Sequence, residues 1–171
     1  DINYLMEKSV QGKIAMKCGM KIPKCTVITC RNHVEWNCFP CITKPLKSII
    51  GAGKYDICIA TSQNELHAIL EKLEANEIQI QEFISKKMEF QLIGCSLNEG
   101  ETIIIPGYTK ILRQPLNTNT GYLEYSPIEN FDFNLESVNA FIREIGYSGL
   151  FSVEFIRAEN DTDYFLEINM R

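Results

Sequence analysis

Two runs of alternating polarity near the end of the sequence constrain the fold most. Residues 150–157 alternate apolar and polar side chains, and residues 163–171 do so again after a short polar stretch. A strand turns successive side chains to opposite faces, so each run predicts a strand with one buried face. Because residues 159–162 are long enough for a turn, the two runs predict an antiparallel β-hairpin.

The register of this hairpin brings two carboxylates together. If Ala158 pairs with Asp163, Glu154 falls directly opposite Glu167 and the apolar sets of both strands share the buried face. The predicted buried face contains Phe151, Val153, Phe155, Tyr164, Leu166 and Ile168. The opposite face of the second strand carries Phe165, Glu167, Asn169 and Arg171.

The row formed by Glu154, Glu167, Asn169 and Arg171 predicts a site for a metal and a phosphate. Two like charges directly opposite on a sheet cost up to about 1 kcal/mol, which an exposed surface tolerates without any function. A divalent cation between the carboxylates would turn the repulsion into attraction. Mg²⁺ binds one or two carboxylates and completes its octahedron with phosphate oxygens and water. Asn169 offers a neutral oxygen, and Arg171 offers a planar fork for phosphate or carboxylate.

Hydrophobic periodicity and capping signals predict three helices, each with a start or a stop signal. Apolar residues at helical spacing follow a capping box in the second of them. Glycine in a left-handed conformation is expected to end the first and the third. The helices are expected at residues 8–18 before Gly19, from Ser62 and Glu65 to Leu73, and from Asn134 to Gly146.

The remaining segments predict short strands in the first half of the chain and longer strands in the second half. Strands are expected at residues 27–29, 39–44, 56–60, 78–84, 89–95, 101–105 and 108–112. Residues 116–130 are polar and turn-rich, and we expect them to be mobile. The sequence therefore predicts an α+β chain whose two subdomains, residues 1–84 and 85–171, enclose a cleft.

Charge and hydropathy exclude some classes of partner. The net charge is -5 and the isoelectric point is near 5.1, whereas a nucleic-acid-binding protein usually presents a basic surface. The 171-residue sequence has no apolar run long enough to span a membrane and no signal-peptide pattern. We therefore expect a cytoplasmic protein with neither nucleic acid nor membrane as a partner.

The seven cysteines are odd in number and irregularly spaced, so no disulfide framework is predicted. Cys38 and Cys41 have the CxxC spacing of a redox pair or of half a zinc site. A zinc site needs further Cys or His ligands, which His33 and His67 do not supply as a pair, and a redox pair should open a helix. The favoured interpretation is two small, partly buried residues.

Six segments, taken in order, resemble the ATP-grasp superfamily. The stretch GYSGLFSVEFIRAENDTDYFLEINMR at residues 146–171 resembles its closing signature, in which a Glu, a second Glu followed by Asn, and then an Arg surround a magnesium–nucleotide. The other segments are YLMEKSVQGKIAMKCGMKIP at 4–23, FPCITKP at 39–45, KSIIGAGK at 47–54, IQIQEFI at 78–84 and MEFQL at 88–92. The resemblance implies the ATP-grasp fold, with two mainly antiparallel subdomains enclosing a nucleotide cleft.

The resemblance also assigns roles to residues. Glu154, Glu167 and Asn169 would bind Mg²⁺ or Mn²⁺, and Arg171 would bind the transferred phosphoryl group. Lys8 and Lys44 would bind nucleotide phosphates, Gly51, Gly53 and Lys54 would belong to a glycine-rich flap, and Glu89 would bind the ribose hydroxyls. Glu82, Phe83 and Ile84 would form the adenine hinge, largely through their backbone. Arg113 would lie near the acceptor or the transferred phosphate.

The resemblance implies an ATP-dependent ligase that activates a carboxylate as an acyl phosphate for attack by an amine. The pattern of residues in the chain is similar to that of the carbamoyl phosphate synthase large chain, biotin carboxylase and D-aspartate-ligase-like enzymes. Relatives of this kind often form homodimers. The flap has only two glycines, and the domains that usually flank this fold have no counterpart in the sequence. We therefore expect the chain to be a nucleotide-binding fragment that is inactive alone. The alternatives are a non-catalytic or regulatory module that binds ATP and magnesium, and a purely structural α+β domain.

Overall fold

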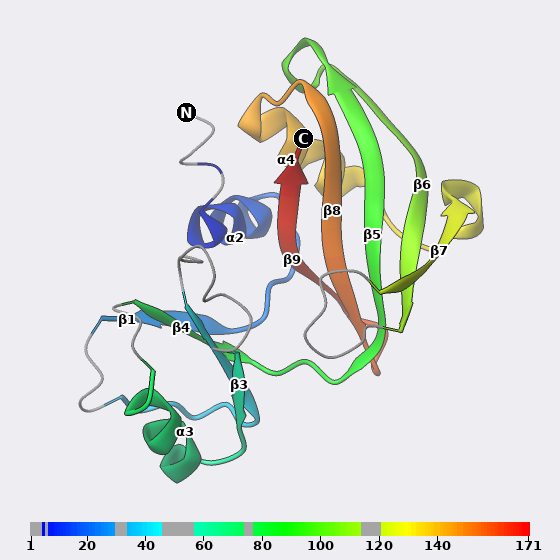
Figure 1. Ribbon diagram of the computed structural model, residues 1–171. Helices are drawn as coiled ribbons and strands as arrows, with labels where there is room; N and C mark the ends of the chain where they lie inside the picture. Colours follow the sequence, from blue (N-terminus) through cyan, green and yellow to red (C-terminus); the bar gives the residue numbers. More distant parts are fainter. Residues whose placement is uncertain (1–4, 6, 30–33, 46–56, 74–76, 114–120) are drawn as a thin grey trace. The chain divides into compact units, whose positions relative to one another are not determined.

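The computed structural model describes residues 5, 7–29, 34–45, 57–73, 77–113 and 121–171, and the chain forms two compact units (Figure 1). Unit 1 consists of Asp1–Ile22 and Ser85–Arg171, and unit 2 consists of Pro23–Ile84. The chain passes from unit 2 back to unit 1 between Ile84 and Ser85. The first 22 residues, however, belong with the second half of the chain, because helix α2 (Lys8–Lys17) packs against strand β9.

Unit 1 is built on a five-stranded antiparallel sheet with the strand order β7-β6-β5-β8-β9. In Figure 1, helix α4 passes behind this sheet and α2 lies beside the edge strand β9. Two short 3-10 helices, η1 and η2, connect strands. The bounds are β5 Lys86–Leu97, η1 Asn98–Gly100, β6 Thr102–Arg113, β7 Tyr122–Pro127, η2 Ile128–Asn130, α4 Glu136–Ile145, β8 Gly149–Ala158 and β9 Asp163–Met170.

The core of unit 1 lies between the sheet and α4. Phe141 and Ile142 of α4 are fully buried against the sheet residues Phe90 and Phe155, whose rings stack with their centroids 5.3 Å apart. Burying large side chains of this kind stabilises a fold by about 1.5–3 kcal/mol each. Since α4 covers this face, the side chains between these positions point to the opposite face of the sheet.

Unit 2 contains a four-stranded antiparallel sheet with the order β1-β4-β2-β3 and one described helix, α3. Leu66 and Leu70 on one side of α3 are buried with Ile78 and Ile80 of the sheet. The bounds are β1 Cys25–Ile28, β2 Cys41–Pro45, β3 Cys58–Ala60, α3 Gln63–Leu70 and β4 Ile78–Glu82.

The predicted start and stop signals of the helices are confirmed, except that the Glu65 carboxylate accepts a hydrogen bond from the Thr61 N–H, at 2.7 Å, where a capping box would use the Ser62 N–H. The Ser62 hydroxyl accepts a hydrogen bond from the backbone N–H of Glu65 at 3.3 Å, as a capping residue does. The Asn134 side chain accepts one from the first residue of α4, the Glu136 N–H, at 2.9 Å. Gly19 and Gly146 follow α2 and α4 with φ of 85° and 60°, the left-handed conformation expected at a helix end.

Two predictions for the second half of the chain are wrong. The strands expected at 101–105 and 108–112 are one continuous strand, β6. Its Pro106 causes no break because it lies at the register shift between Ile93 and Cys95 of β5, where a ladder hydrogen bond is not required. The segment expected to be turn-rich and mobile contains β7, which pairs with β6, while residues 114–120 lie outside the described part of the chain.

The hairpin register contains a correction that leaves the carboxylate pair unchanged. Asp163 pairs with Arg157 rather than with Ala158, and the register shifts by one between Glu154 and Phe155. Leu166 is therefore the extra residue of a β-bulge. The bulge turns Phe165 into the core, where it is 1% exposed and pairs with Phe155, although the alternating pattern predicts Phe165 on the opposite face.

The six cysteines among the described residues are free thiols. Cys41 is fully buried on β2, and burial raises the pKa of its thiol. This is the environment of a structural cysteine rather than a reactive one. No helix in the described ranges is long and apolar enough to cross a membrane.

Candidate functional site

A row of side chains crosses all five strands of unit 1 on the face opposite α4. Each residue pairs directly with the next on the neighbouring strand, so the row runs perpendicular to the strands. Because the core residues Phe90 and Phe155 alternate with row members in sequence, the row faces away from the core. We name this set the carboxylate row; its members are Tyr125, Thr109, Gln91, Glu154 and Glu167.

Glu154 is the most strongly perturbed acid of the row. Burial, and then the negative charges of Glu167 and Glu89, raise the pKa of Glu154 to about 7. Two amides donate to the same oxygen of its carboxylate: Asn169 Nδ2 lies 2.9 Å and Gln91 Nε2 lies 3.0 Å from Oε1. Both amides therefore fix the orientation of the carboxylate, and neither donates a hydrogen bond to its second oxygen, Oε2.

Glu167 is paired with the predicted phosphate-binding lysine. Lys8 Nζ lies 2.7 Å from Glu167 Oε2. Lys8 is the first residue of α2, and this helix is attached to β9 by Gln11, which is 2% exposed. The Gln11 Nε2 donates to the Ile168 carbonyl at 3.1 Å, and the Ile168 N–H donates to Gln11 Oε1 at 3.0 Å. Gln11 therefore places Lys8 beside Glu167.

The other predicted site residues of unit 1 lie around the row. Glu89 precedes Gln91 by two positions on β5, so it shares the same face, and its carboxylate lies 2.6 Å from Lys86 Nζ. Arg171 is exposed at the end of β9, with its backbone N–H 2.9 Å from the Leu150 carbonyl. Arg113 ends β6, and its side chain lies outside what the structure describes.

The predicted residues of unit 2 lie on β2 and at the end of β4. Lys44 is on β2 and pairs with Gln79. The N–H groups of Glu82 and Phe83 donate to the carbonyls of Lys24 and Pro40, at 2.8 and 3.0 Å. These two N–H groups are thus already used within unit 2, so hinge contacts with a nucleotide would need other backbone atoms.

The last predicted residues are Ile84, which is 8% exposed, and Gly51, Gly53 and Lys54, which lie outside the described residues.

The predicted ligands Glu154, Glu167 and Asn169 fit a magnesium ion. No group of three or more His, Cys, Asp or Glu in the described ranges could hold a metal, but Mg²⁺ needs only one or two carboxylates when phosphate and water complete its shell. Burial first, and then the negative charges of Glu167 and Glu89, raise the pKa of Glu154, so neighbouring groups do not fully compensate the charge of its ionised form. A divalent cation beside Glu154 and Glu167 would supply that compensation, and the Asn169 amide can turn its oxygen toward it.

Gln91 is a site residue that the sequence reasoning did not select. It contacts the predicted ligand Glu154 directly. The signal was present in MEFQL, because Glu89 and Gln91 are two residues apart and a strand turns both to the same face.

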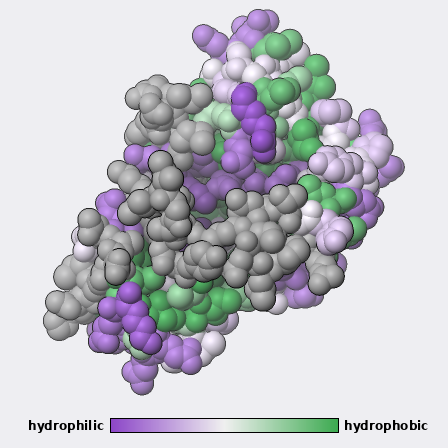
Figure 2. Space-filling view, in the orientation of Figure 1, coloured by the Kyte–Doolittle hydropathy of each residue, from purple (hydrophilic) through white to green (hydrophobic). Residues whose placement is uncertain are grey.

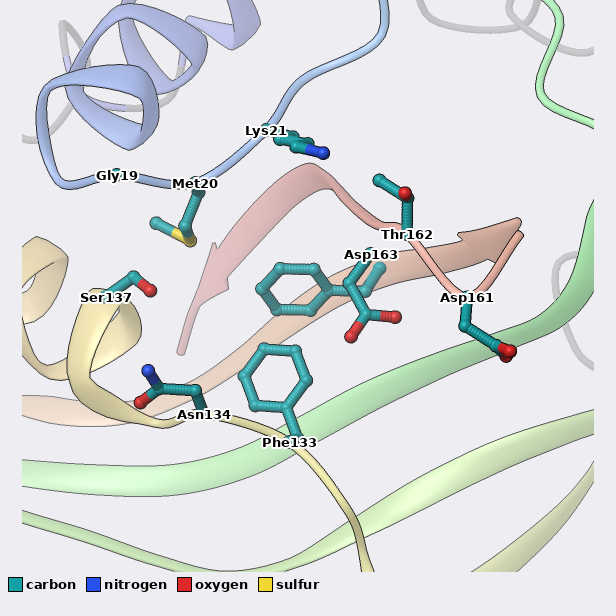
Figure 3. Close-up of a pocket in the computed structure, with 10 residues that line it drawn as sticks. Gly19, Met20, Lys21, Phe133, Asn134, Ser137, Asp161, Thr162 and Asp163 are labelled. Atoms are coloured by element: carbon teal, nitrogen blue, oxygen red, sulfur yellow. The ribbon is translucent and has the colours of Figure 1, made fainter. Parts of the chain in front are cut away.

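Two of the hollows lined by described residues lie on unit 1. Figure 2 shows hydrophilic and hydrophobic residues side by side on the face turned toward the viewer. The hollow in Figure 3 has a volume of about 320 Å³ and lies near the start of α4, with Lys21 and Thr162 across from Asn134 and Ser137. None of the predicted site residues lines it. Its Asp163 is held by Arg157 at 2.7 Å, and its Asp161 by Lys87 at 2.6 Å, so these carboxylates already have partners.

The chain has the ATP-grasp fold. It superimposes on the biotin carboxylase–β,γ-ATP complex from Campylobacter jejuni with a TM-score of 0.75 and 17% identity, covering 99% of this chain and 41% of that one. An L-amino acid ligase from Bacillus licheniformis matches with a TM-score of 0.71 and 15% identity, covering 99% and 41%. At these identities the likeness shows the fold alone.

Sequence comparison finds curated proteins that are similar to all or part of this chain. The formate-dependent phosphoribosylglycinamide formyltransferase of Bacteroides fragilis is 24% identical over 189 aligned positions, which cover 99% of this chain and 46% of that protein. A subunit of RNA polymerase III from Dictyostelium discoideum, rpc1, is 36% identical over 76 residues, but these are only 5% of its length. No protein-family model matches the chain. The chain thus spans less than half the length of the curated relatives it matches.

Proposed function

We propose that this chain is the ATP-binding part of a cytoplasmic ATP-dependent ligase, similar to carbamoyl phosphate synthase, that activates a carboxylate as an acyl phosphate for attack by an amine. The observation that carries the proposal is the opposition of Glu154 and Glu167, with Asn169 bonded to Glu154 and Lys8 to Glu167. The ATP-grasp fold and its ligase neighbours support it. A homodimer is compatible with the proposal.

The residues of the row fit phosphoryl transfer, which depends on positioning and charge neutralisation more than on a protein nucleophile. Glu154, Glu167 and Asn169 would hold Mg²⁺ or Mn²⁺. When bound, the cation neutralises charge on the phosphate oxygens. Lys8 would exchange its bond to Glu167 for one to a phosphate, and Arg171 would bind the transferred group through its planar fork.

Further residues of each unit are proposed as contacts for other parts of the nucleotide. Lys44 would bind the α- and β-phosphates, and the segment Glu82–Ile84 would contact the base. The flap residues Gly51, Gly53 and Lys54 would cover the phosphates. Glu89 would bind the ribose through its carboxylate, which is 17% exposed.

Calorimetric titration of the chain with ATP, with and without Mg²⁺, tests the proposal, and Glu167→Gln is the matched variant. We expect binding that requires the metal and is lost in the variant. A folded chain that binds no nucleotide in either condition contradicts the proposal. Release of ADP on addition of carboxylates and amines then separates a ligase from a non-catalytic module that only binds the nucleotide.

A further inference from the structure

A second hollow of unit 1, of about 510 Å³, adjoins the carboxylate row. A second row of residues crosses the sheet parallel to the carboxylate row, two residues farther along each strand. It forms the floor of the hollow at one end and reaches the predicted metal ligand Asn169 at the other. This second row consists of Pro127, Gly107, Ile93, Ser152 and Asn169, paired in that order across the sheet. The first three residues line the hollow together with Tyr125 of the carboxylate row.

The hollow lies within one small molecule's length of the candidate site. Ile93 is two strands away from Asn169. Because neighbouring strands are 4.7–4.9 Å apart, this separation is about 10 Å. A molecule whose reacting group lies beside Asn169 and Glu154 can therefore place its far end over Ile93.

The lining of the hollow favours an uncharged, apolar occupant. Ile93, Pro127 and Tyr125 present apolar surface, and Tyr125 is 70% exposed although it is a large aromatic residue. Gly107 adds no side chain to the floor of the hollow. A larger residue does not fit there, because its Cβ would lie 2.8 Å from the Ser126 carbonyl oxygen. None of the lining residues is charged, so a charged group placed there would lose hydration without gaining an ionic partner.

The carboxylates on the same face of the sheet as the hollow already have partners, so they do not select the charge of an occupant. Lys8 lies 2.7 Å from Glu167 and Lys86 lies 2.6 Å from Glu89, and Glu154 is a proposed metal ligand. The amine of the acceptor is therefore taken from the ligase function proposed above. The buried hydroxyls of Ser152 and Thr109, 4% and 1% exposed, also lie in the two rows and have no hydrogen-bond partner among the described residues, although buried polar groups normally have one.

We propose that this hollow binds the apolar or aromatic side chain of the acceptor, and that the acceptor is an amine with such a side chain. The proposal rests on the ligase function proposed above and names its second substrate by chemical class. Charged or very small acceptors are poor ligands, because the first lose hydration in the hollow and the second do not reach it.

Methyl NMR on the chain tests this proposal in the presence of ATP and Mg²⁺. The Ile δ1-methyl groups are labelled, and the Ile93 signal is assigned from its loss in Ile93→Leu. Phenethylamine, leucine, glycine and glutamate are then titrated in turn. We expect phenethylamine and leucine to shift the Ile93 signal and to bind at least tenfold more tightly than glycine or glutamate.

Tyr125→Ala should weaken phenethylamine binding about tenfold. Tyr122→Ala is the matched control: it removes a tyrosine of the same strand that is 64% exposed and lies outside the hollow. The acceptor proposal is overturned, and the ligase proposal stands, if the chain binds ATP but neither phenethylamine nor leucine shifts the Ile93 signal. The same holds if Tyr125→Ala and Tyr122→Ala weaken phenethylamine binding equally. Loss of ATP binding by the wild-type chain overturns both.

Discussion

Glu154 and Glu167 lie directly opposite each other on β8 and β9, although a bulge at Leu166 shifts the register between this pair and the hairpin turn. The bulge has a further consequence. It buries Phe165 while keeping Glu167 and Asn169 on the face opposite α4. In a regular strand Phe165 and Glu167 would lie on the same face. The inserted Leu166 puts Phe165 in the core and Glu167 in the carboxylate row.

Removing the charge of one carboxylate should affect stability and metal binding in opposite directions. Glu154→Gln removes a buried charge and its repulsion with Glu167, so without metal we expect the free energy of unfolding at pH 8 to rise by on the order of 2 kcal/mol. The same change removes a proposed ligand, and we expect the affinity for ATP–Mg²⁺ to fall at least a hundredfold. Urea denaturation and calorimetry measure the two effects. Loss of stability at pH 8, or an unchanged affinity for ATP–Mg²⁺, would contradict the expectation.

Stability without metal should fall as the pH rises from about 4.5 to 7. The pKa of Glu154 is raised to about 7 in the folded chain from its ordinary value of 4.5. The folded state therefore holds its proton through a range in which the unfolded state has lost it. This contribution is fully present below pH 4.5 and is lost above about 7. After allowance for solvent screening, it amounts to on the order of 2 kcal/mol.

Comparison with Glu154→Gln isolates this contribution from other titrating groups. The variant should show a pH dependence flatter by that amount in urea denaturation at pH 5 and 7.5. With saturating ATP and Mg²⁺ the wild-type trend should reverse, because the cation favours the ionised carboxylate. A wild-type and variant difference that does not change with pH would show that Glu154 keeps an ordinary pKa.

Much of the fold follows from local sequence signals. The caps at Ser62 and Asn134 and the glycine stops at Gly19 and Gly146 act within one helical turn, so the sequence predicts them without knowledge of the rest of the chain. The opposition of Glu154 and Glu167 also follows, because the buried faces of both strands restrict the register.

The errors arise where distant segments decide the structure. Strand β7 forms because β6 offers an edge for pairing, which its own polar sequence does not show. The bulge at Leu166 lets Phe165 reach a core built by Phe155 and Phe141, and strict alternation cannot anticipate it. Helix α2 joins unit 1 through the contacts of Gln11 with β9, a pairing across 157 positions.

Gln91 should act on metal binding through the orientation of Glu154. Gln91→Met keeps the length of the side chain but removes the donor 3.0 Å from Glu154 Oε1. Asn169 still donates to this oxygen, so we expect a loss of about tenfold in Mn²⁺ affinity rather than its abolition. Electron paramagnetic resonance of Mn²⁺ measures this directly.

Lys17→Met is the control for Gln91→Met. It removes an exposed ion pair with Glu144, on the part of α2 away from the row, and should leave Mn²⁺ affinity unchanged. If Gln91→Met binds Mn²⁺ as the wild-type chain does, Gln91 has no role in positioning Glu154.

Gln11→Leu should cost more stability than its conservative size suggests. The buried Gln11 amide makes two hydrogen bonds with the backbone of Ile168, and leucine leaves both the N–H and the carbonyl of that residue without this partner. Each buried group left unsatisfied costs about 1–3 kcal/mol, so we expect a loss of about 3 kcal/mol in urea denaturation.

Gln11→Glu separates the two bonds, because a carboxylate still accepts from the Ile168 N–H but cannot donate to its carbonyl. We expect it to lose ATP affinity less than Gln11→Leu, since α2 would keep one of the bonds that hold Lys8 beside Glu167. Equal stability of Gln11→Leu and wild type would mean that packing, and not this pair of bonds, attaches α2 to β9.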